Sequence, residues 1–216
     1  MFKTKKELVF VVLSGIFITN AVVAELIGGK LIQMGPFVMS MGIVPWPVVF
    51  LTTDLINEYF GEKGVQKLSL LTACLIGYSF LILLIALQIP AAKNISPVSD
   101  TQFGAVFGQS MWIIVGSIIA FLLSQLVDVW LFHFLKSKTG HKKIWLRSTG
   151  STVISQLIDS FVVLGIAFYL PGKISFEVFV TSALTGYTFK LILAVVLTPL
   201  IYLGHSTIDK FIQKDT

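Results

Sequence analysis

Charged residues are scarce in this chain of 216 residues, where they make up only 12%. A soluble domain carries about 25% charged residues, so this scarcity argues against a soluble enzyme or binding domain. Hydrophobic residues reach 55%, and the mean hydropathy is +0.88. This composition suits a chain whose solvent is the lipid bilayer, and the length fits one membrane domain without a soluble catalytic domain.

Cysteine and histidine are also rare. The single cysteine, Cys74, excludes an intramolecular disulfide and a cysteine cluster for metal, and its apolar surroundings predict a small core residue. The three histidines have no metal-ligand spacing, and GxSxG, HExxH and P-loop motifs are missing. We therefore expect no enzyme activity, no cofactor, no metal site and no ATP hydrolysis by this chain.

Long apolar runs predict an all-α membrane protein, a bundle of six transmembrane helices in a single domain covering residues 1–216. The first run follows three lysines, but it is too long for the apolar part of a signal peptide, so we expect it to be retained. The predicted spans cover residues of about 8–27, 43–60, 67–90, 111–135, 148–170 and 176–204.

Two segments do not have the pattern of a continuous helix. Residues 28–47 are apolar but contain four glycines and three prolines, which break or delay helices. We predict a re-entrant or irregular segment before helix 2, enclosed by protein or by a water-filled cavity. Residues 91–110 form the longest predicted outer loop, and we expect a short helix there on the membrane surface.

The lysines and the single arginine predict the orientation in the membrane. With the N-terminus inside, 12 of the 16 basic residues fall in cytoplasmic segments. This asymmetry predicts a multi-pass protein of the cell inner membrane with both termini in the cytoplasm. The net charge of +5 and the basic loop near residues 136–147 are then explained by topology and anionic lipid rather than by nucleic acid.

Five charged residues nevertheless fall inside the predicted spans. A charge near the bilayer centre costs at least ~2.5–3.5 kcal/mol, so these residues must face one another or a wet cavity. They are Glu25, Asp54, Asp128, Asp159 and Lys190. We expect Lys190 to pair with one of the three aspartates, and a purely structural ion pair is the alternative.

One pentapeptide occurs twice, as SQLVD at 124–128 and as SQLID at 155–159. Residues three and four apart share a helix face, so each copy presents its glutamine and its aspartate together. Counted from the basic loop that joins the two spans, the aspartates differ in depth by only about 6 Å. We expect both faces to line one cavity, with polar helix packing as the alternative, above all for the serines.

These groups suit two kinds of chemistry. Carboxylates accept N–H donors and amides both donate and accept, so Asp with Gln could bind the edge of a guanine-like base. Intramembrane carboxylates also carry protons or bind sodium in pumps and transporters. Asp54, Asn57 and Glu58 extend the polar set in the second span, although Glu58 lies near the cytoplasmic end and could simply be solvated.

Three stretches resemble the queuosine precursor transporter family, also labelled a vitamin uptake transporter family. They are TDLINEYFG (53–61), SQLVD (124–128) and WLRSTGSTVISQLIDS (145–160). The resemblance extends over nearly the whole chain. It implies an inner-membrane importer of deazaguanine bases, such as 7-cyano-7-deazaguanine (preQ0) and the aminomethyl form (preQ1), for tRNA queuosine modification.

We therefore predict a transporter with two sets of site residues. The predicted substrate-binding residues are Gln156, Asp159, Gln125, Asp128, Asn57 and Ser155. The predicted coupling or gating residues are Asp54, Glu58, Lys190, Glu25 and Arg147. The partners would be a purine-like base and the lipid bilayer, with no nucleic acid and with a homo-oligomer left open.

Two other classes of protein compete with this interpretation. One is a substrate-binding membrane subunit for a vitamin-like molecule that needs a separate ATPase partner. The other is a structural membrane scaffold, whose intramembrane charges would tolerate neutral substitution.

Overall fold

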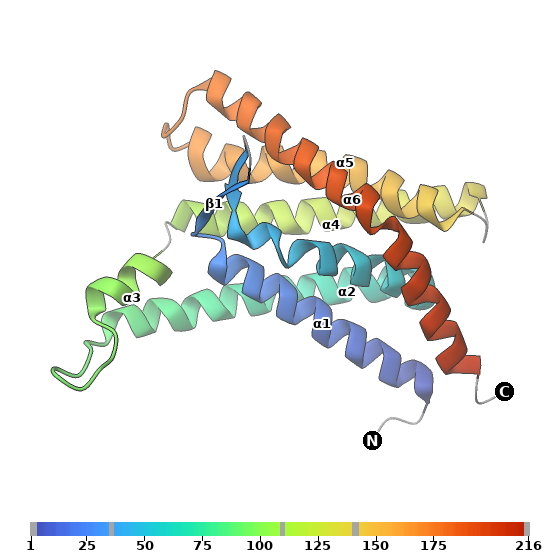
Figure 1. Ribbon diagram of the computed structural model, residues 1–216, viewed down its shortest axis with the longest axis horizontal. Helices are drawn as coiled ribbons and strands as arrows, with labels where there is room; N and C mark the ends of the chain where they lie inside the picture. The colour runs from blue at the N-terminus through green and yellow to red at the C-terminus, as the bar shows by residue number, and fades with distance from the viewer. Residues whose placement is uncertain (1–3, 35–36, 109–110, 140–142, 214–216) are drawn as a thin grey trace.

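The computed structural model describes residues 4–34, 37–108, 111–139 and 143–213. Within these ranges, five helices are long and apolar enough to cross a membrane. They pack into the bundle of Figure 1. The long helices are α1 (Lys5–Ile27), α2 (Trp46–Gln88), α4 (Met111–Thr139), α5 (Ile144–Leu164) and α6 (Phe176–Gln213), and a π-helix, η2 (Gly165–Tyr169), continues α5.

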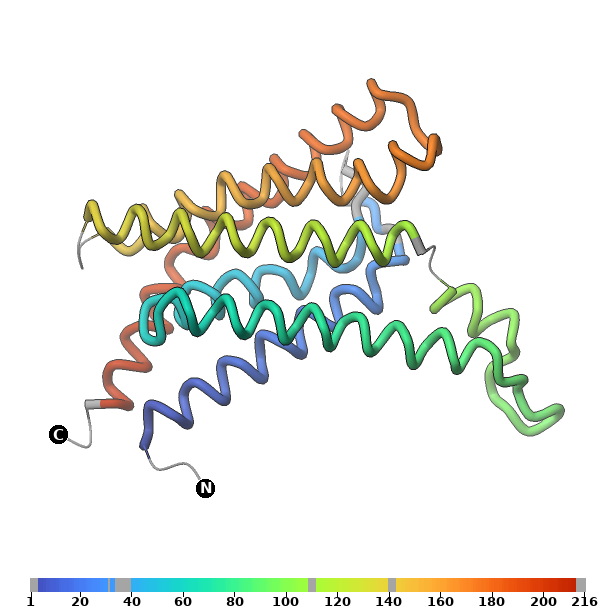
Figure 2. The backbone as a smooth tube through the Cα atoms, turned by 180° about the vertical axis from the view of Figure 1, so that it is seen from behind, coloured from blue at the N-terminus to red at the C-terminus, as the bar shows by residue number. Residues whose placement is uncertain are grey.

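Helix α2 reverses its direction at Gly61. The backbone of this glycine is not helical, with φ 74° and ψ 177°. Figure 2 shows the chain running one way before this point and the opposite way after it. The predicted second and third spans therefore fall on the two arms of α2, residues 46–60 and 62–88. The count of six membrane spans itself stays a prediction.

Replacing Gly61 by alanine is expected to destabilise the protein through the backbone alone. A Cβ at Gly61 meets no atom within 4 Å, but a positive φ costs an L-residue roughly 1–2 kcal/mol. The thermal unfolding midpoint in detergent should fall by roughly 2–8 °C. Gly77→Ala is the matched control, because that site is helical and equally open, and it should leave the midpoint unchanged or raised. Equal shifts in both variants would contradict this account.

The described residues between α1 and α2, 28–34 and 37–45, form no α-helix. Strands β1 (Leu31–Met34) and β2 (Phe37–Ser40) pair in antiparallel fashion and lead into the short 3-10 helix η1 (Met41–Ile43). The Ser40 hydroxyl donates to the Gly28 carbonyl at 2.7 Å. A Cβ on Gly42 would lie 2.6 Å from the Ala24 carbonyl oxygen, so this close approach to α1 requires glycine. The segment is irregular, as expected, and its entry into the membrane stays a prediction.

The loop after α2 carries one short helix, α3 (Asp100–Phe107). A capping box fixes its start, because the Ser99 hydroxyl accepts from the Gln102 backbone N–H and the Gln102 side chain accepts from the Ser99 N–H. Figure 1 places α3 beyond one end of the bundle. The predicted short helix is present, and its contact with a membrane surface stays a prediction.

The interior of the bundle is polar where α5 passes through it. Every buried residue of α5 is polar: Arg147, Ser148, Ser151, Thr152, Ser155, Gln156, Asp159 and Ser160. Large apolar residues of the same helix, such as Ile154 and Leu157, are exposed. In water the apolar residues would be buried and the polar residues exposed. The exposed apolar surface therefore indicates a lipid environment.

Apolar character alone does not distinguish the protein core from the lipid-facing surface. Cys74 illustrates this, because it is exposed on the second arm of α2. The expectation of a small core residue at this position is wrong. In a membrane protein an apolar run faces lipid on one side and protein on the other, so its composition does not indicate which side a residue takes.

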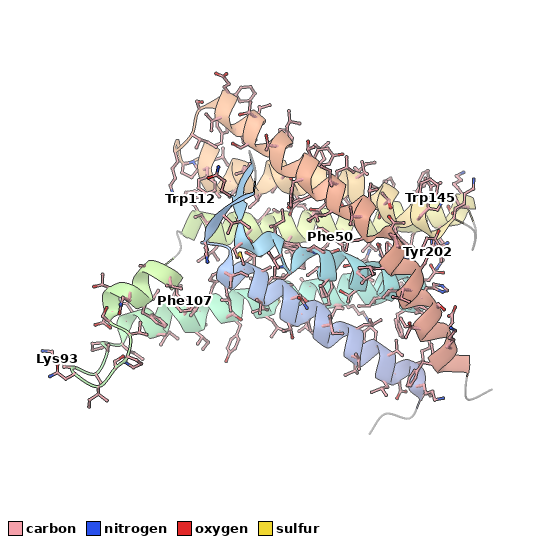
Figure 3. All side chains as sticks on the ribbon, in the orientation of Figure 1. Phe50, Lys93, Phe107, Trp112, Trp145 and Tyr202 are labelled. Carbon is pink, nitrogen blue, oxygen red and sulfur yellow. The ribbon has the colours of Figure 1, made fainter. Side chains whose placement is uncertain are left out.

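Tryptophans mark the two ends of the bundle. Figure 3 shows Trp112 and Trp145 at opposite ends, and both side chains are about half exposed, at 51% and 48%. Indole rings gather at the two membrane–water interfaces because they are apolar with one polar N–H. Helix α1 begins and α6 ends at the Trp145 end (Figure 1). There the Lys5 ammonium lies 5.4 Å from the centre of the Phe211 ring.

Candidate polar centre between the helices

The two copies of the pentapeptide face each other across α4 and α5. The Ser155 hydroxyl donates to Oδ1 of Asp128 at 3.0 Å, and the Ser124 hydroxyl makes a longer contact, 3.5 Å, with Oδ1 of Asp159. Each serine thus contacts the aspartate of the other copy, which gives this helix pair a local two-fold symmetry. Gln125 and Gln156 are buried on the same faces. The four predicted glutamine and aspartate side chains therefore lie at one depth of the bundle.

Asp159 also binds the lysine of α6. The Lys190 ammonium forms an ion pair with Oδ2 of Asp159, and both side chains are largely buried. The sequence leaves three aspartates open as partners of Lys190, and the structure places it at Asp159. A ligand that binds Oδ2 of Asp159 through a cation or an N–H must therefore compete with Lys190.

Glu25 joins this region from α1. Its carboxylate accepts a hydrogen bond from the Ser117 hydroxyl of α4, and it lies within electrostatic range of Asp159 and Lys190. Lys190 therefore has two acidic neighbours within the bundle, Asp159 as its ion-pair partner and Glu25 at longer range.

The first arm of α2 adds polar atoms that have no hydrogen-bond partner among the described residues. Asn57 is fully buried, and within this part of the chain neither its side-chain oxygen nor its nitrogen is bonded. Oδ2 of Asp54 accepts from the Ser148 hydroxyl, while Oδ1 is buried without a partner. Unsatisfied buried polar groups are uncommon and call for an explanation, such as a ligand or an ion. Gln125 reaches this arm, because its Nε2 donates to the Thr53 hydroxyl at 3.3 Å.

A three-helix charge cluster closes the centre at the Trp145 end. Oε2 of Glu58 accepts from the Arg147 guanidinium at 2.6 Å and from the Lys136 ammonium at 3.1 Å. Arg147 is completely buried and lies 5.6 Å from the centre of the Phe132 ring. Glu58 is therefore paired rather than simply solvated, and it connects the first arm of α2 to α4 and α5.

Several side chains of the centre do not follow from sequence reasoning. They are Ser117, Ser148, Thr53 and Lys136. Ser124 is part of the repeated pentapeptide, but unlike Ser155 it is not among the predicted site residues. Lys136 contributes to the topology prediction, but nothing in the sequence pairs it with a glutamate 78 positions away.

The hollow that borders the polar centre at Asp54 is small. A surface hollow of about 610 Å³ lies elsewhere, between the start of α1 and residues such as Phe60 and Gly64 of α2. The hollow beside Asp54 has a volume of only about 10 Å³. Pockets for small molecules are usually ~300–1,000 Å³. A purine-sized molecule would therefore fit beside Asp54 only if the surrounding helices moved apart.

A membrane bundle with a buried, charged and hydrogen-bonding centre is the architecture of a solute transporter. Residues 40–204 match the family model described as "Putative vitamin uptake transporter". The chain belongs to this family, and the family resemblance found in the sequence is confirmed.

Curated relatives match over about three quarters of the chain. The "Probable queuosine precursor transporter" of Bacillus subtilis (strain 168) is 28% identical, over 76% of this chain and 72% of that protein. The "Queuosine precursor transporter" of Escherichia coli (strain K12) is 27% identical, over 74% of this chain and 69% of that protein. The "Probable queuosine precursor transporter" of Haemophilus influenzae is 26% identical, over 74% of this chain and 66% of that protein. No solved structure matches this one.

Proposed function

We propose that this protein imports queuosine precursors, deazaguanine bases such as preQ0 and preQ1, across the cell inner membrane for tRNA modification. One observation carries the proposal: buried aspartates, glutamines and an unpaired asparagine converge between helices that face lipid. The names of the curated relatives point to the same class of substrate.

The chemistry of the centre suits a flat base with both donors and acceptors. A guanine-like edge presents adjacent N–H donors beside a carbonyl acceptor, and carboxylates and amides complement these groups. We assign substrate binding to Gln156, Asp159, Gln125, Asp128, Asn57 and Ser155. We assign coupling or gating to Asp54, Glu58, Lys190, Glu25 and Arg147.

The proposed orientation places both termini in the cytoplasm. It rests on the excess of lysine and arginine in the inner segments, where the positive-inside rule places them. The Glu58–Arg147–Lys136 cluster would then close the inner side of the centre, and importing a base would require it to open.

Uptake by proteoliposomes tests the proposed function. Purified full-length protein, reconstituted without any ATPase subunit, is expected to accumulate radiolabelled preQ1 above the level of protein-free liposomes. Excess unlabelled preQ0 should suppress the signal, because both bases present the same guanine-like edge. The measurement is the initial rate of uptake.

The rival classes predict different results in the same experiment. Uptake that occurs only after ATPase subunits are added would identify a binding subunit instead. A structural scaffold would show no uptake, and its thermal stability would tolerate asparagine at Asp54, Asp128 and Asp159.

A further inference from the structure

A water-sized cavity lies between the first arm of α2, α5 and α6. Its volume is about 10 Å³, which is room for about one water molecule. The polar side chains in its wall carry only oxygen atoms, and they belong to Asp54, Ser148, Thr149 and Thr152. The rest of the wall is apolar and comprises Phe50, Leu51, Ala194, Leu197 and Ile201.

Asp54 is the acidic side chain in the wall of this cavity. The residue is only 4% exposed, and its Oδ1 atom has no hydrogen-bond partner in the described part of the chain. Among the described residues, no lysine, arginine or histidine forms an ion pair with Asp54 or with Asp128. Asp128 and Arg147 both lie within electrostatic range of Asp54, and Arg147 forms its ion pair with Glu58. Thr152 connects Asp54 with Asp128, since it lines the cavity and its hydroxyl lies near Asp128.

The nearby described hydroxyls donate elsewhere than to Oδ1 of Asp54. Ser148 donates to Oδ2 of Asp54, and the Thr149 hydroxyl shares a 3.1 Å contact with that of Thr198. A bound water would supply hydrogen bonds but no positive charge. A carboxylate in the membrane interior costs at least ~2.5–3.5 kcal/mol, and a cation bound at Oδ1 of Asp54 would lower this cost.

We propose that this cavity is a binding site for one sodium ion. Carboxylate and hydroxyl oxygens are the ligands that hard cations prefer. A divalent ion such as Ca²⁺ takes about 6–8 oxygens, usually from several carboxylates, whereas this wall offers one carboxylate. The small volume favours sodium over potassium. A proton would need neither the cavity nor the hydroxyl wall.

The position of the site links the ion to transport, a step that rests on the proposed function. The wall is formed by three separate helices, including α5 and α6, which carry the Asp159–Lys190 ion pair. A bound ion would hold these helices in the closed arrangement. Entry of sodium down its gradient could then drive import of the base.

Thermal unfolding of the purified full-length protein tests the site without any base. The unfolding midpoint is measured in detergent as NaCl replaces choline chloride at constant ionic strength. We expect a saturable rise with sodium and a smaller effect of KCl. Thr149→Val should weaken the apparent sodium affinity at least about tenfold, because it removes one oxygen ligand at nearly constant volume. Asp54→Asn should abolish the sodium response.

Thr188→Val is the matched control. Thr188 is exposed on α6 and donates only to the Leu184 carbonyl at 2.8 Å, so its substitution should leave the sodium response intact. A midpoint that does not respond to sodium in the unmodified protein overturns the proposal. A sodium response that survives equally in Thr149→Val and Asp54→Asn overturns it as well.

Uptake separates failure of the ion site from failure of the proposed function. Base uptake that proceeds equally in sodium and choline, and that follows a pH gradient, overturns the sodium site and leaves the importer in place. A sodium-dependent midpoint without uptake of either base supports the ion site and contradicts the proposed substrate.

Discussion

Glu58→Gln is expected to lower the free energy of unfolding by about 3–5 kcal/mol, because it removes the anion from a buried charge cluster. Arg147 is completely buried and donates to Glu58 at 2.6 Å. A neutral amide at position 58 leaves this guanidinium charge without its carboxylate in a low-dielectric region. The loss should appear as a fall of roughly 10 °C in the thermal unfolding midpoint in detergent.

Two further variants test the cause of this loss. Glu62→Gln is the matched control, because Glu62 accepts from the Gln66 amide at 2.8 Å and glutamine keeps that acceptor. Its effect should stay within about 0.5 kcal/mol. The double variant Glu58→Gln/Arg147→Met should recover much of the stability, because it removes both buried charges and keeps an apolar side chain against Phe132. A double variant as unstable as the sum of both single variants would contradict the ion-pair explanation.

Asp159→Asn and Lys190→Met are expected to change base affinity in opposite directions. Asp159 is the proposed acceptor for the base, so Asp159→Asn should weaken binding of preQ1 by about 10- to 100-fold, the usual loss for a charge-assisted hydrogen bond. Lys190 occupies Oδ2 of the same carboxylate. Without the lysine, the base no longer competes with an ammonium group for this oxygen. The Lys190→Met variant should therefore bind preQ1 about tenfold more tightly.

Isothermal titration of purified variants with preQ1 measures both effects. Lys67→Met and Asp100→Asn are the controls, because these side chains are exposed and outside the polar centre. Both controls should bind as the unmodified protein does. Equal affinity of Asp159→Asn and the unmodified protein would remove Asp159 from the binding site. Weaker binding by Lys190→Met would mean that Lys190 contacts the base rather than competing with it.

Much of the helical fold could be predicted from the sequence because lipid imposes long apolar segments. The glycines and prolines of residues 28–47, which interrupt helices, likewise indicated the irregular segment before Trp46. The reversal at Gly61 was harder to place, because a single glycine with positive φ replaces a visible loop. Cys74 was misplaced because apolar runs are compatible with lipid and with protein alike.

The candidate site was predictable to the level of helix faces but not of partners. The spacing of glutamine and aspartate placed Gln125 with Asp128 and Gln156 with Asp159, because helical geometry is local. Lys190 pairs with Asp159, and Arg147 pairs with Glu58. Which residues pair in this way depends on how helices that are distant in the sequence rotate against one another. Such rotation is set by the packing of many side chains, which no short motif encodes.

The crossed contacts between the two pentapeptides bear on how this family varies among species. The Ser124 hydroxyl contacts Asp159 and the Ser155 hydroxyl contacts Asp128, so each motif depends on the other rather than on itself. Residues in contact tend to change together during evolution. In a broad alignment, position 124 should therefore covary with 159 and position 155 with 128, although both correlations cross from one copy to the other.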